Sequence, residues 1–208
     1  MSADSQSSHI FKILVVGDLG TGKTSIIKRY VHNVFSTHYK STIGVDFALK
    51  VIDWEDGSII RLQLWDIAGQ ERFGSMTRVY YKESVGALLV FDVTRPTTLE
   101  VVLKWKRDVD DKVRFKDGSN IPVVLIANKM DALSKSEIEA MQQRLDEFVL
   151  AHNFIAWYPT SAKENINIEE SCRHLIRSVL ERKVLFAGDD DKGSTVKLGA
   201  RHKYLSCC

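Results

Sequence analysis

The sequence contains few cysteines and no long apolar run, and these shortages exclude several classes of protein. Three cysteines in 208 residues cannot form a disulfide framework, which favours a reducing compartment. No run of about 18 apolar residues is present, so no membrane-spanning helix is predicted. The polar start, MSADSQSSHIFK, lacks the apolar stretch of a secretory signal peptide. We therefore expect a cytosolic protein.

An excess of charge of one sign is also lacking. The 29 basic and 27 acidic residues give a net charge of +2, so the sequence lacks the basic excess of a nucleic-acid-binding protein, and we expect no such partner. A hydrophobic fraction of 44% over 208 residues is enough for one domain with a sizeable core, followed by a tail.

Short apolar runs alternate with amphipathic stretches along the chain. Four runs are typical of buried strands: Ile10–Gly17, Gly86–Val93, Ile121–Asn128 and Phe154–Thr160. Polar residues placed three positions before a glutamate, at Thr97, Ser134 and Asn167, predict the N-termini of intervening helices. This order predicts an α/β fold with a parallel sheet that is covered by helices on both faces.

One segment differs, because an Asp-Gly pair at 56–57 separates two strand-like runs. Asp-Gly is a strong signal for a β-hairpin. If the turn is centred on this pair, Phe47 lies opposite Asp66, and Thr42 lies near Gln70. The loops before and after the hairpin are therefore expected to lie side by side.

The stretch GDLGTGKT, residues 17–24, matches the pattern G-x-x-x-x-G-K-[ST] between a predicted strand and a predicted helix. The glycines let the backbone N–H groups point inward, and the start of the helix adds positive potential. Lys23 is expected to reach the β- and γ-phosphates, and the Thr24 hydroxyl to ligate Mg²⁺. A chance glycine-rich turn is the alternative, which the strand–loop–helix context disfavours. The motif predicts a nucleoside triphosphate without identifying the base.

The stretches NKMD, residues 128–131, and SAK, residues 161–163, follow predicted strands, where ligands bind in open α/β sheets. The Asp131 carboxylate can accept hydrogen bonds from N1–H and the exocyclic amine of guanine, a donor pair that adenine lacks. The N–H of Ala162 can donate to guanine O6. Each stretch alone also fits an ordinary polar turn. Together and in this order, they predict that the base is guanine.

Five stretches resemble the Ras superfamily of small GTPases, and the Rab branch in particular: TIGVDF, WDIAGQERF, NKMD, SAK and the terminal Cys-Cys. The resemblance covers roughly Ile10 to Lys183. The stretches KRYVHNVFS and GVDFALK, together with Ile67 in WDIAGQ, resemble the sequences of the Rab subgroup that is linked to lysosome-related organelles. The resemblance implies a P-loop NTPase three-layer fold, whose six-stranded sheet is mostly parallel with one antiparallel strand. It also implies a GTPase domain over residues 9–184 and a flexible hypervariable tail over 185–208.

The resemblance further implies roles for individual residues. Thr24, Thr42 and Asp66 are expected to hold Mg²⁺, and the N–H groups of Thr42 and Gly69 to contact the γ-phosphate. Gln70 is expected to be the catalytic residue, because it would orient the attacking water. The expected nucleotide-binding set is Gly17, Leu19, Gly20, Thr21, Gly22, Lys23, Thr24, Ser25, Phe35, Thr42, Gly69, Asn128, Lys129, Asp131, Ser161, Ala162 and Lys163.

The activity that follows is slow hydrolysis of GTP by a molecular switch in vesicle trafficking and organelle biogenesis. Removal of the γ-phosphate would release two loops, and fast turnover would need an arginine from a partner. Phe47, Trp65 and Tyr80 are expected to form a patch for effectors, although they also fit ordinary core aromatics. Leu19, where Ras carries glycine, and Ile67, where most Rabs carry threonine, are expected to affect the hydrolysis rate and not the choice of nucleotide.

The last two residues, Cys207 and Cys208, are expected to carry geranylgeranyl groups, because two lipid chains give stable attachment where one is marginal. Cys172 falls at helical spacing with apolar residues and is expected in the core. The expected partners are an exchange factor, a GTPase-activating protein, GTP-state effectors, a dissociation inhibitor and an escort protein. We expect a monomer on the cytoplasmic face of endosomal, lysosome-related or phagosomal membranes, with a soluble cytosolic pool.

Two other classes of function fit parts of the sequence. A P-loop nucleotide kinase would share residues 17–24, but NKMD and the lack of a recognisable lid segment oppose it. A scaffold that binds GTP without hydrolysing it is suggested only by Leu19. Phosphate transfer to a nucleoside monophosphate would support the kinase hypothesis. Single-turnover hydrolysis of GTP tests the scaffold hypothesis.

Overall fold

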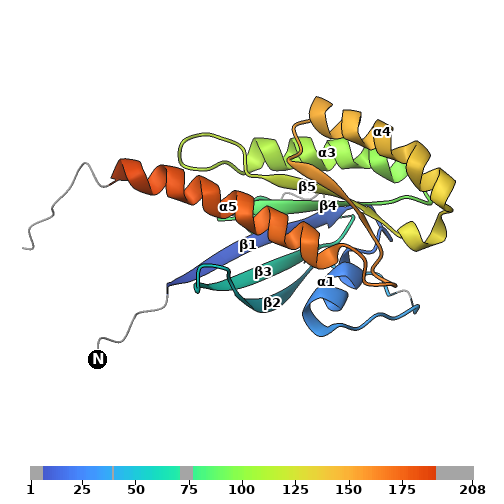
Figure 1. Cartoon of the computed structure of the whole chain (residues 1–208), viewed down its shortest axis with the longest axis horizontal. Coiled ribbons are helices and arrows are strands. Elements are labelled where there is room, and N and C mark those ends of the chain that lie inside the picture. The colour runs from blue at the N-terminus through green and yellow to red at the C-terminus, as the bar shows by residue number, and fades with distance from the viewer. Residues whose placement is uncertain (1–6, 39, 71–76, 191–208) are drawn as a thin grey trace, which may run out of the picture.

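The structure is a computed structural model that describes residues 7–38, 40–70 and 77–190. A six-stranded sheet in the order β2-β3-β1-β4-β5-β6 forms its centre (Figure 1). The elements are β1 (Ser8–Gly17), α1 (Lys23–His32), β2 (Val45–Asp53), β3 (Ile59–Ile67), α2 (Thr77–Tyr81), β4 (Gly86–Asp92), α3 (Thr97–Lys112), β5 (Val123–Asn128), the short 3₁₀ helix η2 (Met130–Ala132), α4 (Lys135–Ala151), β6 (Ala156–Thr160) and α5 (Ile168–Asp190).

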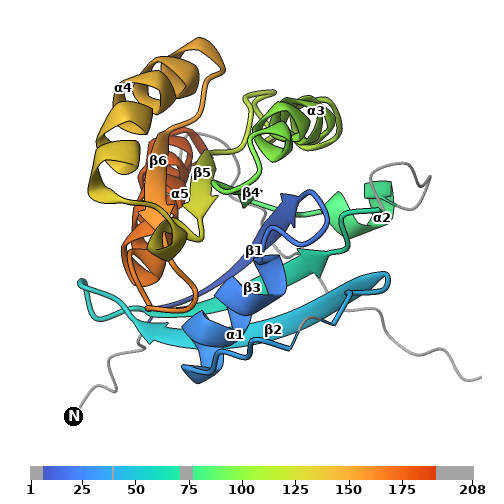
Figure 2. The same cartoon turned by 90° about the vertical axis from the view of Figure 1, so that its right-hand side faces the viewer.

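All neighbouring strands are parallel except β2 and β3, which form the antiparallel hairpin. Helices α1 and α5 bury their apolar residues on one face of the sheet. Helices α3 and α4 cover the other face, and both lie in the upper part of Figure 2. The predicted three-layer fold, with one antiparallel strand in a mostly parallel sheet, is confirmed.

The register of the hairpin differs from the prediction by one residue. Phe47 pairs with Trp65, and not with Asp66. The turn holds three residues between its last paired positions, because Trp54 N–H donates to the Ser58 carbonyl at 2.8 Å. Since successive side chains point to opposite faces of a strand, this shift places Phe47 and Trp65 on the same face.

The expected proximity of the two loops that flank the hairpin is confirmed. The N–H of Ala68, just after β3, donates to the carbonyl of Gly44, just before β2, at 3.0 Å. The predicted adjacency survives the shift in register, because moving the pairing by one residue still leaves both loops at the same end of the hairpin.

The predicted helix starts are correct, but only one of the three uses the predicted cap. Ser134 forms a full capping box with Glu137 at the start of α4. At α3 the N-cap is Pro96, which offers no side-chain hydrogen bond, and Thr97 is already the first helical residue. The side chain of Asn167 donates instead to the Pro159 carbonyl at 2.7 Å, because a partner outside the helix lies within its reach.

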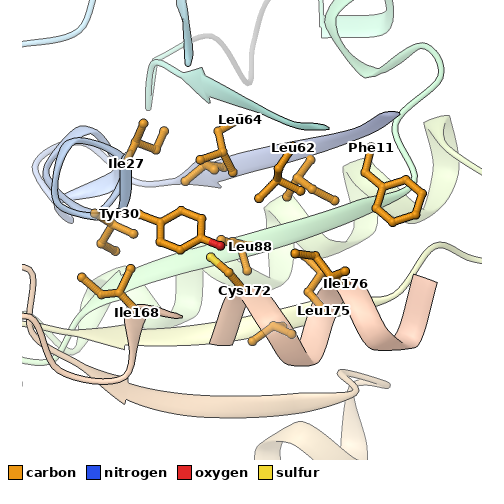
Figure 3. Packing of buried hydrophobic residues seen from close by; sticks show 14 of the residues in the cluster. Phe11, Ile27, Tyr30, Leu62, Leu64, Leu88, Ile168, Cys172, Leu175 and Ile176 are labelled. Carbon is orange, nitrogen blue, oxygen red and sulfur yellow. The ribbon is translucent and has the colours of Figure 1, made fainter. Parts of the chain in front are cut away.

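The face between α1 and α5 is closely packed. In Figure 3 the ring of Tyr30 on α1 points toward Cys172 on α5, with Ile27 and Leu175 on the same two helices. Cys172 is buried, as the sequence predicts, and burial raises the pKa of its thiol to about 12. Helix α1 is therefore held in place by its apolar side. The residues on its other side consequently start from a fixed backbone.

None of the helices in the described ranges is long and apolar enough to cross a membrane. Helix α5 continues to Asp190, so its backbone stays helical beyond residue 184, where the sequence places the end of the domain. The rest of the predicted tail, with Cys207 and Cys208, lies outside the described residues.

Candidate nucleotide-binding site

A cleft of about 340 Å³ opens at the carboxyl ends of the strands, within the range of small-molecule sites. It lies where β1 runs into α1, where β5 ends at Asn128, and where β6 leads into residues 161–163. The predicted nucleotide-binding residues that line it are Leu19, Gly20, Gly22, Lys23, Thr24, Ser25, Phe35, Thr42, Gly69, Asn128, Lys129, Asp131, Ala162 and Lys163.

Three residues of the predicted set do not line the cleft. Gly17, Thr21 and Ser161 are buried behind its wall. Gln70, the predicted catalytic residue, is exposed and also lies outside the lining. Its neighbour Glu71 lies outside the described residues.

Two glycines allow the loops around the cleft to approach closely. Gly22 has a φ of 96°, and a Cβ atom there would lie 2.3 Å from the side-chain nitrogen of Asn128. A Cβ atom on Gly69 would lie 2.5 Å from the backbone nitrogen of Leu19. A side chain at either position would push the surrounding loops apart.

Lys23 lies at the centre of the predicted phosphate loop. Its ammonium donates to the carbonyls of Gly17 and Asp18 at 3.0 and 2.9 Å. Burial lowers the pKa of Lys23 to about 8, although Asp66 and Asp18 oppose this shift. Because the partners of this buried ammonium are mainly neutral carbonyls, little negative charge neutralises its positive charge. The ammonium is therefore well suited to an anionic ligand such as a phosphate.

Two hydroxyls and one carboxylate converge beside Lys23. The Oγ1 atoms of Thr24 and Thr42 lie 2.8 Å apart, and the Thr24 hydroxyl donates to Asp66 Oδ2. Asp66 Oδ1 is buried and has no hydrogen-bond partner among the described residues. Burial raises the pKa of Asp66, against hydrogen bonds that lower it. This set of oxygens fits a hard divalent cation such as Mg²⁺, which takes few protein ligands and completes its shell with water and phosphates.

The predicted guanine-binding residues are connected to one another. Asn128 donates to the Thr21 carbonyl at 2.9 Å and accepts from the Ala162 N–H at 3.3 Å, so it joins the phosphate loop to residues 161–163. Ser161 Oγ donates to Asp131 Oδ1 at 2.5 Å. These contacts hold Asp131 and the Ala162 backbone at the same end of the cleft.

Asp92 was not predicted from the sequence, and it lies at the end of β4, where it joins the two halves of the site. Its Oδ2 accepts from Lys129 at 2.7 Å, and Lys129 also donates to the Gly20 carbonyl at 2.9 Å. Burial opposes ionisation of Asp92, but hydrogen bonds led by that from Lys129 outweigh burial and lower the pKa. Its place at the carboxyl end of a predicted strand was the available signal.

Arg95 was also missed. Its Nε donates to Asp92 Oδ2 at 3.0 Å, and its Nη2 donates to the Leu19 carbonyl at 2.8 Å. Arg95 thus supports the phosphate loop at Leu19. No sequence motif marks this arginine, because its role depends on contacts with a backbone carbonyl far away in the chain.

The predicted effector patch is partly assembled. Phe47 is 51% exposed, and its ring lies 5.9 Å from that of Trp65 in an edge-to-face arrangement. Lys12 places its ammonium 3.8 Å from the centre of the Trp65 ring. Trp65 and Tyr80 are half-buried and pack against the core between the sheet and α3. Trp65 and Tyr80 are therefore partly core residues, whereas the ring of Phe47 is exposed and available to a partner.

Comparison with known proteins relates the chain to one family. The Ras family model matches residues 12–181. The chain is 56% identical to "Ras-related protein Rab-32" of Homo sapiens over 190 residues, 91% of this chain and 84% of that protein. It is 60% identical to "Ras-related protein Rab-32A" of Dictyostelium discoideum over 179 residues, 86% and 81% of the two chains. It is 45% identical to "Ras-related protein Rab-7L1" of Homo sapiens over 201 residues, 96% and 98%.

Proposed function

Since the chain belongs to the Ras family, as a Rab GTPase related to the Rab-32 subgroup, we propose that its cleft binds the nucleotide through the residues that line it. The protein hydrolyses GTP and is a switch in membrane trafficking and organelle biogenesis. The observation that carries the assignment of the site is that Lys23 and Asp131 line the same cleft. One supplies a cation for phosphate, and the other an acceptor for guanine.

Competitive binding tests this assignment directly. We expect GTP and GDP to displace a fluorescent GDP analogue from the purified protein, whereas ATP and ADP leave it bound, because adenine offers no donor pair to Asp131. Displacement by adenine nucleotides at similar concentrations would contradict the assignment of the base-binding end.

At the phosphate end, Lys23 would exchange its carbonyl partners for phosphate oxygens. Thr24, Thr42 and Asp66 would hold Mg²⁺, which supplies charge neutralisation at the β- and γ-phosphates when bound. Asp66 Oδ1, which has no hydrogen-bond partner among the described residues, supports this assignment. Asp66 would act in its ionised form, with its burial offset by the positive charge of the site.

At the base end, Asp131 would accept the two guanine donors and Ala162 would donate to O6. Phe35 is half-buried and lines the cleft, and it would lie against the base, opposite the Lys129 stem. The existing hydrogen bonds of Lys129 to Gly20 and Asp92 support this position.

The switch would use the loops that hold Thr42 and Gly69, one before and one after the hairpin. Each would be held by the γ-phosphate through a backbone N–H, so hydrolysis would release both. Rab GTPases work with regulators and effectors in general. For this chain we propose an exchange factor, an activating protein, a dissociation inhibitor, an escort protein, and effectors that contact Phe47, Trp65 and Tyr80.

Gln70→Leu is expected to lower hydrolysis stimulated by a Rab-activating protein by about tenfold or more, because leucine cannot orient water. Binding of GTP should be unchanged, since Gln70 does not line the cleft. Single-turnover hydrolysis with and without the activating protein measures the effect. Gln142→Leu, at an exposed position on α4, is the matched control. A stimulated rate within twofold of the wild type would remove Gln70 from the catalytic role.

Attachment to membranes is proposed to depend on geranylgeranylation of Cys207 and Cys208. The segment after residue 184, which begins as the end of α5, would act as a spacer between the GTPase domain and the membrane. Membrane association is implied by the Rab relationship. We propose the cytoplasmic faces of endosomal, lysosome-related or phagosomal membranes as the compartments, with a soluble pool in the cytosol.

Deleting Cys207 and Cys208 is expected to move the protein from the membrane fraction to the soluble fraction of cells, with nucleotide binding intact. Cys207→Ser and Cys208→Ser alone should each give partial attachment, because a single lipid chain binds membranes only marginally. Fractionation after a salt wash measures this, and the wash removes attraction due to basic residues alone. If the double deletion still pellets with membranes, the anchor lies elsewhere.

A further inference from the structure

Arg29 uses all three nitrogens of its guanidinium group at the base-binding end of the cleft. Its Nε donates to the carbonyl of Ala162, and its Nη2 donates to the carbonyl of Lys163, both at 2.9 Å. Its Nη1 donates to the backbone and side-chain oxygens of Asn33 at 3.0 and 3.1 Å. The side chain therefore connects two segments that lie far apart in the sequence.

The first of these segments carries the backbone N–H of Ala162, which is assigned to guanine O6. Arg29 binds the carbonyls of two consecutive residues, Ala162 and Lys163, and so holds in place the backbone that directly follows the Ala162 N–H. A planar guanidinium can hold two adjacent acceptors at once, whereas the ammonium of a lysine cannot reproduce this fork.

The second segment leads to Phe35. Asn33 is the C-cap of α1 and adopts a left-handed conformation with φ 55°. The chain then turns back along the cleft, and the centre of the Phe35 ring lies 6.0 Å from the Arg29 guanidinium. Both segments assigned to the base are thus attached to one side chain.

The helix that carries Arg29 is a rigid support. Ile27 and Tyr30 of α1 are buried against the sheet and α5 (Figure 3), and α1 begins at Lys23 in the phosphate loop. Arg29 makes no ion pair within the described part of the chain. Its hydrogen bonds go to neutral oxygens, so the geometry of the fork, and not charge pairing, explains its position.

We propose that Arg29 is a positioning residue for guanine, which sets the place of the Ala162 N–H and of Phe35 relative to the phosphate loop. This inference rests on the proposed function of the cleft. It implies that loss of Arg29 weakens contacts to the base and leaves contacts to the phosphates and Mg²⁺ unchanged. The effect should therefore be equal for GDP and GTP, and it should depend on atom 6 of the base.

The test compares release of GDP with release of 6-thioguanosine diphosphate, in which a weak sulfur acceptor replaces O6. In Arg29→Ala we expect GDP to dissociate about tenfold faster, as for the loss of one or two net hydrogen bonds. The thio nucleotide should be affected much less, so the wild-type preference for GDP should fall by at least half. Arg29→Lys should be intermediate, and added guanidinium ions should partly restore slow release in Arg29→Ala.

Arg173→Ala is the matched control, because Arg173 pairs with Glu169 and lies over Trp54, away from the cleft. It should release both nucleotides at the wild-type rate. Equal acceleration of both nucleotides in Arg29→Ala, or GDP release within twofold of the wild type, would overturn the inference while the proposed function stands. Failure of the wild type to retain guanine nucleotides would instead reject the proposed function.

Discussion

Asp131→Asn is expected to lose affinity for GTP by about 10³-fold or more and to gain affinity for xanthosine triphosphate. Asp131 lines the cleft, and Ser161 holds one of its oxygens at 2.5 Å, so the carboxylate has a fixed orientation. An asparagine in this position presents an NH₂ group to the exocyclic amine of guanine, and the two donors face each other. Xanthine carries an oxygen at that atom and restores a donor–acceptor pair.

Competition of GTP and xanthosine triphosphate against a fluorescent nucleotide measures both halves of this prediction. Asp111→Asn, at an exposed position near the end of α3, makes the same chemical change away from the cleft and should leave both affinities unchanged. Unaltered binding of GTP by Asp131→Asn would show that Asp131 does not recognise the base. A loss of GTP without a gain of xanthosine triphosphate would indicate damage to the loop.

Thr24→Asn is expected to weaken GTP binding at least about tenfold more than GDP binding, which leaves the chain in the GDP or nucleotide-free state. The hydroxyl of Thr24 lies between Thr42 and Asp66, and these three residues would hold the proposed Mg²⁺, which would supply charge neutralisation at the phosphates. The triphosphate depends on this cation more than the diphosphate does, because it carries the additional charge.

Affinities for GTP and GDP measured over a range of Mg²⁺ concentrations test the role of Thr24. Thr24→Ser keeps the hydroxyl and should behave as the wild type, with the same dependence on Mg²⁺. If Thr24→Asn lost GTP and GDP equally, Thr24 would have a structural role in the phosphate loop and no special relation to the metal.

Short local patterns were sufficient to predict the α/β class and three of the segments that line the cleft, whereas the six-stranded sheet, Phe35 and Gly69 were implied only by the family resemblance. The strands that end at Gly17, Asn128 and Thr160 lie in apolar runs, and the carboxyl ends of parallel strands meet at one edge of a sheet. The position of each motif in the fold therefore follows from the strand that leads into it. The phosphate loop and the guanine-binding residues could be brought together without knowledge of any long-range contact.

The register of the hairpin could not be obtained in the same way. An Asp-Gly pair is compatible with both a two-residue turn and a longer one. Here the Asp56 side chain accepts from the Ser58 N–H at 2.8 Å, which supports the three-residue loop. Gly57 follows with a φ of 81°. The choice depends on a side-chain contact that the residue types alone do not specify.

Arg29, Asp92 and Arg95 escaped sequence analysis for a different reason. Arg29 and Arg95 donate to backbone carbonyls of distant residues. Every residue has a backbone carbonyl, so the residue type of the acceptor does not reveal such a contact. Asp92 accepts from Lys129, which the NKMD motif marks, but the sequence does not show that the end of β4 lies beside this lysine. Residues that support a site through backbone contacts can be identified only from the structure. Residues of a ligand-binding motif can be identified from the sequence.

The hydrogen bond between Ala68 and Gly44 joins the two loops that are proposed to act as switches. Because they are joined at the same end of the hairpin, a displacement of the Thr42 loop would be transmitted to the Gly69 loop. The two phosphate contacts would then break together, and intermediate states with one loop released would be sparsely populated. A partner that touches only one of the loops would therefore sense the state of both, and its response to hydrolysis would be close to all-or-none.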